Sequence, residues 1–138
     1  MIYTTYFDNL KNLPSNIFPI AICGKCPDDY KGLKYPKLAP KKGFWLEWEK
    51  NKDNDFYVQH FNDEVLSNLN VEDCIAELYG LLPEDVKQML YITNCPPWEN
   101  PHYQIALVCF EKPNEFCHRN QVADWINNYM KRKIVTEF

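Results

Sequence analysis

The strongest constraint on the fold of this chain is a run of consecutive apolar residues near its C-terminus. Every residue from Ile105 to Phe110 is apolar, and the segment from Gln104 to Glu111 has the length of a strand. A strand that is apolar at every position has to be covered on both faces, which is typical of parallel sheets. The segment therefore predicts a buried strand of a layered α/β domain.

The rest of the chain alternates in the same manner between strand-like and helical patterns. A chain of 138 residues has the length of one domain. We therefore predict a single α/β domain over residues 1–138, with a mostly parallel sheet flanked by helices. Its strands are expected over residues 2–6, 16–23, 104–111 and 134–138, and its helices over 44–50, 54–68, 71–81, 83–90 and from 117 onward. Two connections, 24–43 and 94–103, carry too much proline to be regular.

Charge and hydropathy narrow the class of partner. The formal net charge is −4 and the isoelectric point is about 5.3, which argues against a broad electrostatic grip on nucleic acid. The lysine-rich segment 31–42, interleaved with tyrosines, leaves nucleic acid as a minor alternative. No apolar segment approaches the roughly 20 residues of a membrane helix, and no signal peptide is visible. We expect a cytoplasmic protein that binds no membrane, with its six cysteines as reduced thiols, ligands or core residues.

One segment carries most of the candidate chemistry. Glu111 ends the apolar strand, a short turn follows, and Cys117-His118-Arg119 opens the last helix. Ligands of open α/β sheets bind at the carboxyl ends of strands, where helix N-termini attract anions. A helix start with neighbouring histidine and arginine lowers the pKa of a thiol. Cys117 is therefore a candidate nucleophile, Glu111 an acid/base, His118 a proton carrier, and Arg119 with Lys112 a clamp for an anion.

The same residues also have a purely structural interpretation, which the sequence leaves open. Cys117 can be a buried cysteine at a helix start, and His118 a capping or hydrogen-bonding group. Arg119 can form an internal ion pair with Glu111. In that case the segment stabilises the fold or holds a ligand without chemistry.

A second group of cysteines follows the segment 16–23. Cys23-Gly24-Lys25-Cys26 has the spacing of zinc knuckles and of redox-active thiol pairs. The pair lacks a second such pair, so a metal or redox role through Cys23 and Cys26 stays an alternative, and incidental thiols are the simpler interpretation. If the two buried strands are parallel, Lys25 lies at the same edge as Arg119 and adds positive charge.

Aromatic residues offer further candidates. Trp45 and Trp48 are three residues apart, so one helical face can bury both of them. Trp98 lies among prolines and is the better candidate for an aromatic residue in a binding loop. His60, within the predicted helix 54–68, is expected to be structural.

The C-terminal motif also resembles a known family. Cys109-Phe110-Glu111-Lys112-Pro113, followed by Phe116-Cys117-His118-Arg119 and Ala123, is similar to the signature of domain of unknown function 488 (DUF488). Weaker likenesses to a short-form branch of that family lie at 3–7, 13–14, 19–22, 32 and 38–40. The resemblance implies an α/β domain with a site at Glu111, Cys117, His118 and Arg119, and it implies no particular reaction.

The chain departs from that family at the end of the second strand. Longer members carry Asp-Val-Arg there, whereas this chain has Ala21-Ile22-Cys23-Gly24-Lys25, so no arginine contact carries over. Together these observations predict a site for a small anionic ligand, such as a nucleotide or another phosphate-bearing compound, with no cofactor. They leave open whether the protein is a cysteine-dependent enzyme of unknown reaction or a non-catalytic binding module, and they do not define an oligomeric state.

Overall fold

The computed structural model describes residues 1–138 and places five strands in one sheet. The strand order is β3-β2-β4-β1-β5, and every pairing is parallel. The strands are β1 (Ile2–Tyr6), β2 (Ile17–Ala21), β3 (Leu33–Lys34), β4 (Gln104–Cys109) and β5 (Val135–Glu137). The predicted α/β class is confirmed, and β4 occupies the middle of the sheet, as its continuous burial requires.

The α-helices lie close to their predicted positions. They are α1 (Lys42–Asn51), α2 (Asn54–Glu64), α3 (Val71–Gly80), α4 (Glu84–Ile92) and α5 (His118–Met130), joined by four short 3-10 helices at Phe7–Asn12, Pro36–Leu38, Leu66–Asn68 and Pro97–Glu99. Asn70 caps α3, because its side chain accepts a hydrogen bond from the Asp73 N–H at 3.0 Å. The predicted helix 54–68 ends early, at Glu64. The side chains of Ser67 and Asn68 there bond back to the preceding carbonyls and compete with the helix.

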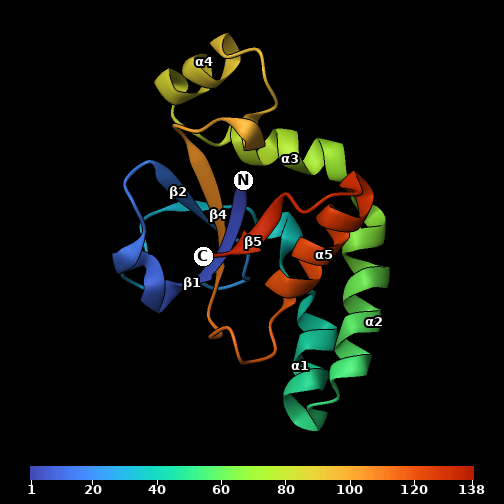
Figure 1. The fold of residues 1–138 in the computed structure, drawn as a ribbon. Coiled ribbons are helices and arrows are strands. Elements are labelled where there is room, and N and C mark those ends of the chain that lie inside the picture. Colours follow the sequence, from blue (N-terminus) through green and yellow to red (C-terminus); the bar gives the residue numbers. More distant parts are fainter.

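The two faces of the sheet carry residues of different size. Successive strand residues point to opposite faces. The long aliphatic side chains of Ile20, Ile105 and Leu107 belong to the main core, whereas Ala21, Ala106 and Val108 alternate with them and stay outside it. Figure 1 shows α1, α2 and α5 together on one side of the sheet. We infer that the helices pack on the aliphatic face.

One short strand, β3, lies inside the connection predicted to be irregular. It pairs with β2 only opposite Ile20 and Ala21. Pro19, one residue earlier, has no N–H to donate, so β2 can accept a partner on that side only after the proline. The Pro19 carbonyl instead accepts a hydrogen bond from the Tyr30 hydroxyl at 3.2 Å. The strand was not predicted because it has only two residues and lies in a proline-rich segment.

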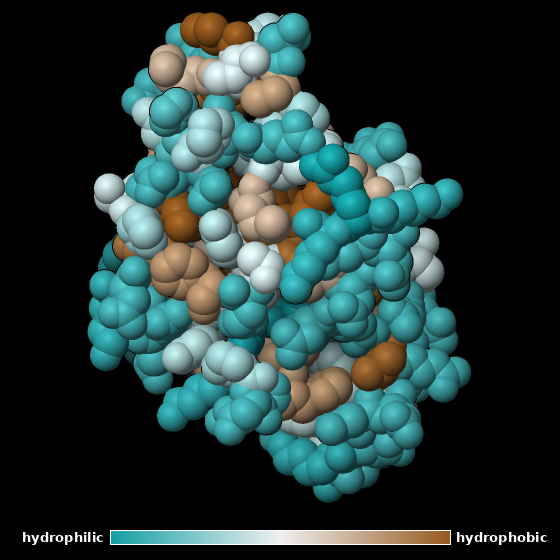
Figure 2. Space-filling model, viewed as in Figure 1, coloured by the Kyte–Doolittle hydropathy of each residue, from teal (hydrophilic) through white to brown (hydrophobic).

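The two ends of the sheet have different surroundings. Helix α4 lies at the amino end of β4, opposite to the β4–α5 connection (Figure 1). Met89 and Ile92 of α4 are exposed, and apolar atoms are visible at that end of the surface in Figure 2. A shallow hollow of about 640 Å³ lies there, lined by residues that include Tyr79, Lys87 and Tyr91. This hollow is therefore remote from Cys109 and Cys117, which lie at the carboxyl end of the sheet.

The central position of β4 predicts that its side chains contribute strongly to the free energy of unfolding. Leu107 is fully buried, so Leu107→Ala removes core contacts and leaves a cavity. We expect it to lower the free energy of unfolding by about 2–5 kcal/mol in urea titrations. Leu46→Ala is the matched control, because Leu46 is 43% exposed and its loss should change stability by less than about 0.5 kcal/mol. Equal effects of the two substitutions would contradict the central placement of β4.

Candidate functional site at the carboxyl end of β4

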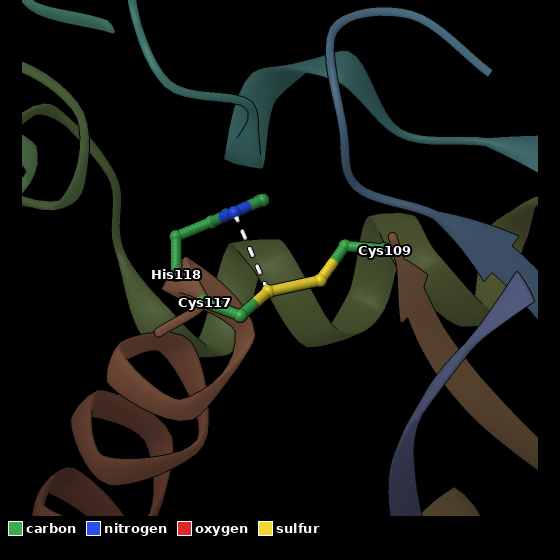
Figure 3. A group of neighbouring side chains, drawn as sticks. All are labelled: Cys109, Cys117 and His118. Atoms are coloured by element: carbon green, nitrogen blue, oxygen red, sulfur yellow. Dashed lines mark hydrogen bonds between the residues drawn. A yellow bond between two sulfur atoms is a disulfide. The ribbon is translucent and has the colours of Figure 1, made fainter. Parts of the chain in front are cut away.

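The fold brings Cys109, Cys117 and His118 together at the carboxyl end of the sheet. Cys109 is the last residue of β4 and Cys117 precedes α5, and a disulfide joins their sulfurs (Figure 3). The expectation of reduced thiols is wrong for this pair in the state described by the structure. The three potential ligand atoms lie within 4.8 Å of one another, so in the reduced state the group also has the composition of a metal site.

Cys117 occupies the N-cap position of α5. Its backbone is extended, and its sulfur accepts a hydrogen bond from the Arg119 N–H at 3.5 Å. The free N–H groups of a helix start favour a negative charge, and so they favour the thiolate over the thiol. The sequence placed Cys117 correctly at a helix start, and the structure adds that its side chain is 95% buried.

His118 is held in one orientation by the neighbouring strand. Its Nε2 lies 2.8 Å from the carbonyl oxygen of Ile22, directly after β2. Because a carbonyl oxygen can only accept, Nε2 carries the ring proton and donates the hydrogen bond. Its Nδ1 then has a free lone pair and lies 3.9 Å from the Cys117 sulfur (Figure 3). Burial lowers the pKa of His118 to about 4, so the imidazole is neutral at physiological pH. The oriented imidazole therefore presents a lone pair to the sulfur, although burial makes it a weaker base than an exposed histidine.

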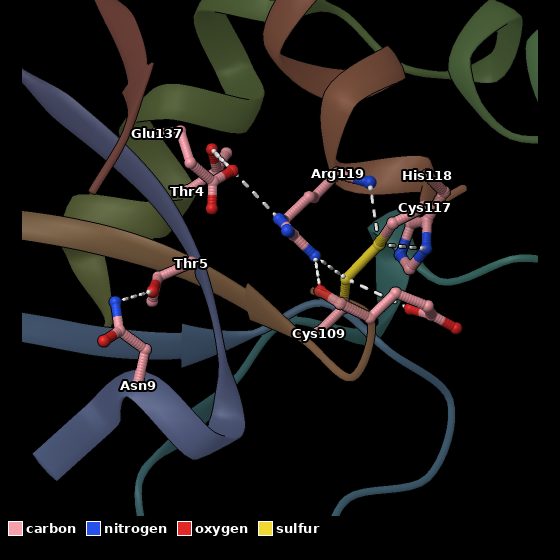
Figure 4. Close-up of polar contacts among 9 residues, drawn as sticks. Thr4, Thr5, Asn9, Cys109, Cys117, His118, Arg119 and Glu137 are labelled. Carbon is pink, nitrogen blue, oxygen red and sulfur yellow. Dashed lines mark hydrogen bonds and ion pairs between the residues drawn. A yellow bond between two sulfur atoms is a disulfide. The ribbon is translucent and has the colours of Figure 1, made fainter. Parts of the chain in front are cut away.

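Arg119 is fully buried and connects the site to the edge of the sheet. Its Nε donates to Glu137 of β5 at 3.1 Å, and Nη1 donates to the Glu111 carbonyl and to the Cys109 sulfur, the latter at 3.2 Å (Figure 4). The ion pair predicted with Glu111 is thus formed with Glu137, while Glu111 contributes its backbone. Nη2 is buried and has no hydrogen-bond partner. An unpartnered donor of this kind is costly, and an anionic ligand would satisfy it.

Glu111 follows β4 and lies beside the disulfide. Its Oε2 is 3.6 Å from the Cys109 sulfur, and the side chain is partly buried. Burial raises the pKa of the Glu111 carboxyl, an effect that Arg119 opposes. A carboxyl with a raised pKa can exchange protons closer to neutral pH, as the acid/base role expected for Glu111 requires.

An aromatic cluster, which the sequence analysis did not predict, adjoins the site. The Phe61 ring of α2 meets the His118 ring edge to face, with 5.3 Å between centroids. Phe116, directly before Cys117, packs on Tyr57 at 5.0 Å and on Trp48 at 5.7 Å. This cluster explains the burial of His118 and hence its low pKa. Tyr57 and Phe61 are four residues apart and are both buried on α2, and nothing in the sequence indicated that His118 would pack against them.

The remaining candidates lie near the site without contacting it. Lys25 and Lys112 are exposed, and neither side chain donates a hydrogen bond or forms an ion pair. The sulfurs of Cys23 and Cys26 are 3.8 Å apart and both are free. Burial is the main cause that raises the pKa of Cys23, to about 12, which keeps this thiol protonated. The pair belongs to no group of three or more potential metal ligands.

The three tryptophans named from the sequence have different surroundings in the structure. Trp98 packs against the core, and its backbone carbonyl accepts a hydrogen bond from the Met1 amino group at the amino end of β1. Trp98 and its loop therefore lie at the amino end of the sheet, away from Cys117. Trp48 is partly buried and its indole donates to Asn54 at 3.0 Å, whereas Trp45 is 39% exposed, so the predicted burial holds only for Trp48. His60 lies at the surface, 2.6 Å from Glu64.

Fold and site together define an all-parallel α/β protein with a cysteine–histidine pair at the carboxyl end of its central strand. Residues 14–130 match the family model DUF488-N3a, described as the active DUF488-N3 subclade. The chain therefore belongs to this DUF488 family, as the resemblance of its C-terminal segment indicated. No curated protein and no solved structure matches it. None of its helices combines the length and apolar character needed to cross a membrane.

The buried neutral histidine predicts a pH-dependent stability. The pKa of His118 is about 4 in the folded protein against 6.5 for an ordinary histidine, so unfolding takes up a proton between these values. The free energy of unfolding is therefore unaffected by His118 above pH 6.5. It decreases as the pH falls from 6.5 towards 4, by up to roughly 3 kcal/mol. We expect urea titrations to show that His118→Asn removes this part of the wild-type pH dependence.

His102→Asn is the control, because His102 is exposed and its side chain makes no hydrogen bond. This variant should keep the wild-type dependence over the same range. A wild-type protein and a His118→Asn variant with parallel stability–pH curves would contradict the buried neutral state of His118.

Proposed function

We propose that this protein binds a small anionic ligand of the phosphate-bearing class, which includes nucleotides, and acts on it through the thiolate of Cys117. The observation that carries the proposal is the position of the Cys117 sulfur. It lies between the Arg119 N–H, at 3.5 Å, and the free lone pair of His118 Nδ1, at 3.9 Å. This arrangement combines a helix-start anion site with a nucleophile and its base.

The nucleophile is generated when Cys109 and Cys117 are reduced. His118 Nδ1 accepts the Cys117 proton, and its Nε2–H remains on the Ile22 carbonyl, which fixes the tautomer and the ring orientation. The resulting thiolate is stabilised by the Arg119 N–H at the start of α5. Glu111 lies close enough to exchange a proton with a ligand group or with Cys109.

Recognition of the anion is assigned mainly to Arg119. Its Nη2 is the buried donor without a partner, and the helix N-terminus supplies further N–H groups. Lys25 and Lys112 are exposed near the same end of the sheet and add positive charge at the entrance. Residues 112–115 of the β4–α5 connection are exposed. Cys117 and Arg119 are buried, so we expect this connection to move when a ligand enters.

The binding part of the proposal is tested with adenosine monophosphate and inorganic phosphate on the reduced protein. We expect Arg119→Lys to weaken binding by about tenfold or more in calorimetric titrations, because a lysine cannot reproduce the guanidinium geometry. Cys117→Ser should retain binding, since it removes the nucleophile and keeps the anion donors. Iodoacetamide should alkylate Cys117 more slowly when either anion is bound.

Arg132→Lys is the matched control, because Arg132 is an exposed arginine paired with Glu99. Equal weakening by Arg132→Lys and Arg119→Lys, or no binding of either anion, would refute the proposed recognition.

The chemical part is tested with acetyl phosphate, a small acyl and phosphoryl donor. We expect a covalent adduct on Cys117, detected by mass spectrometry and formed about tenfold or more slowly in His118→Asn. Anion binding with no adduct and no dependence on His118 would favour the alternative, a binding module in which the same residues hold the ligand without chemistry.

A further inference from the structure

We propose that Cys109 is the resolving cysteine of Cys117, so that a hydroperoxide converts the two thiols into the observed disulfide and a thiol reductant reopens it. This inference rests on the proposed role of Cys117 as a thiolate and assigns a function to a second residue of the same site. It also names the regulation of the site, because Cys117 has no free thiolate while the disulfide is closed.

The geometry supports this pairing over any other in the chain. Cys109 ends the central strand and Cys117 caps α5, and their sulfurs are bonded within the folded domain. The other four cysteines are free, and of these Cys23 and Cys26 approach only each other. Cys109 and Cys117 are only 1% and 5% exposed, so the oxidant that suits this site is a small molecule such as hydrogen peroxide rather than a protein disulfide.

The first step oxidises Cys117. Its thiolate attacks one oxygen of hydrogen peroxide, the O–O bond breaks, and the leaving hydroxide takes up a proton to give water. Cys117 becomes a sulfenic acid by this transfer of one oxygen atom, and the peroxide is reduced by two electrons.

The second step uses Cys109. Glu111 Oε2 lies 3.6 Å from its sulfur and accepts the thiol proton, while Arg119 Nη1, at 3.2 Å, stabilises the thiolate. This thiolate attacks the sulfenic sulfur of Cys117, the S–O bond breaks, and the hydroxyl group leaves as water with the proton held by Glu111. The sum is two thiols and one peroxide giving one disulfide and two waters. A dithiol reductant then reverses the S–S bond by exchange.

Arg119 distinguishes the Cys109–Cys117 pair from the other cysteines of the chain. Its backbone N–H contacts the Cys117 sulfur and its guanidinium contacts the Cys109 sulfur, so one residue stabilises both thiolates. Stabilisation of the reduced form makes a disulfide easier to reduce, as expected of a regulatory rather than a structural bond.

The test is a peroxide titration of the reduced full-length protein, followed by thiol blocking and peptide mass spectrometry. Cleavage after glutamate at Glu111 and Glu115 separates the two cysteines. We expect the wild type to form the Cys109–Cys117 disulfide and dithiothreitol to reopen it. In Cys109→Ser, the sulfenic acid on Cys117, trapped with dimedone, should rise about tenfold because its partner is missing. Cys95→Ser is the control and should behave as the wild type.

A wild-type measurement covers the case in which Cys109→Ser folds poorly. Dimedone added before peroxide should divert Cys117 to the dimedone adduct and suppress the disulfide. The inference is overturned if dimedone labels Cys109 instead, if peroxide leaves both thiols reduced, or if the disulfide cannot be reopened in the folded protein. Binding of adenosine monophosphate is measured separately on the reduced protein. An intact redox cycle without anion binding would therefore refute the proposed function and leave the role of Cys109 standing.

Discussion

The burial of β4 on both faces is the constraint on which the rest of the molecule depends. A central parallel strand has no exposed position, so its residues are apolar until the chain leaves the sheet. Cys109 is the last residue of β4, and Glu111 follows it in the turn. The Ile22 N–H donates to the Val108 carbonyl at 3.0 Å, and the Ile22 carbonyl accepts from His118. The backbone that completes the sheet therefore also orients the imidazole of the site.

The position of Arg119 depends on a second, electrostatic interaction. A guanidinium as deeply buried as that of Arg119 needs a counter-charge. Glu137 supplies it from β5, and its carboxylate also accepts a hydrogen bond from Thr4 of β1 at 2.9 Å. β5 in turn pairs with β1. The C-terminal strand is thus a structural support for Arg119, although it contributes no residue with chemistry of its own.

The sequence predicted the fold well and the site in part, for identifiable physical reasons. Continuous apolarity in β4 and the helix start at Cys117 are local signals, and both were confirmed. The Arg119–Glu137 pair is a contact between separate elements, and no local pattern encodes it. The Cys109–Cys117 disulfide spans eight residues across a turn, where spacing alone does not distinguish bonded sulfurs from buried thiols.

The aromatic cluster was missed for a different reason. Phe61, Tyr57 and Trp48 have the spacing of ordinary core residues, and their packing agrees with that interpretation. These rings belong to the site because Phe116, before α5, and His118, at its start, pack on them. The neutral state of His118 arises from these tertiary contacts, so the sequence of α2 around Tyr57 and Phe61 carries no sign of it.

Burial has opposite effects on the two partners of the proposed nucleophile. It favours a neutral His118 and, by the same physics, an uncharged Cys117 thiol, so an empty site disfavours the separated thiolate and imidazolium. The Arg119 N–H and guanidinium oppose this effect by donating to the two sulfurs. A ligand or oxidant that consumes the thiolate removes its charge and draws the proton transfer forward. In the proposed mechanism the nucleophile therefore stays latent in a low-dielectric environment and forms when a reaction partner is present.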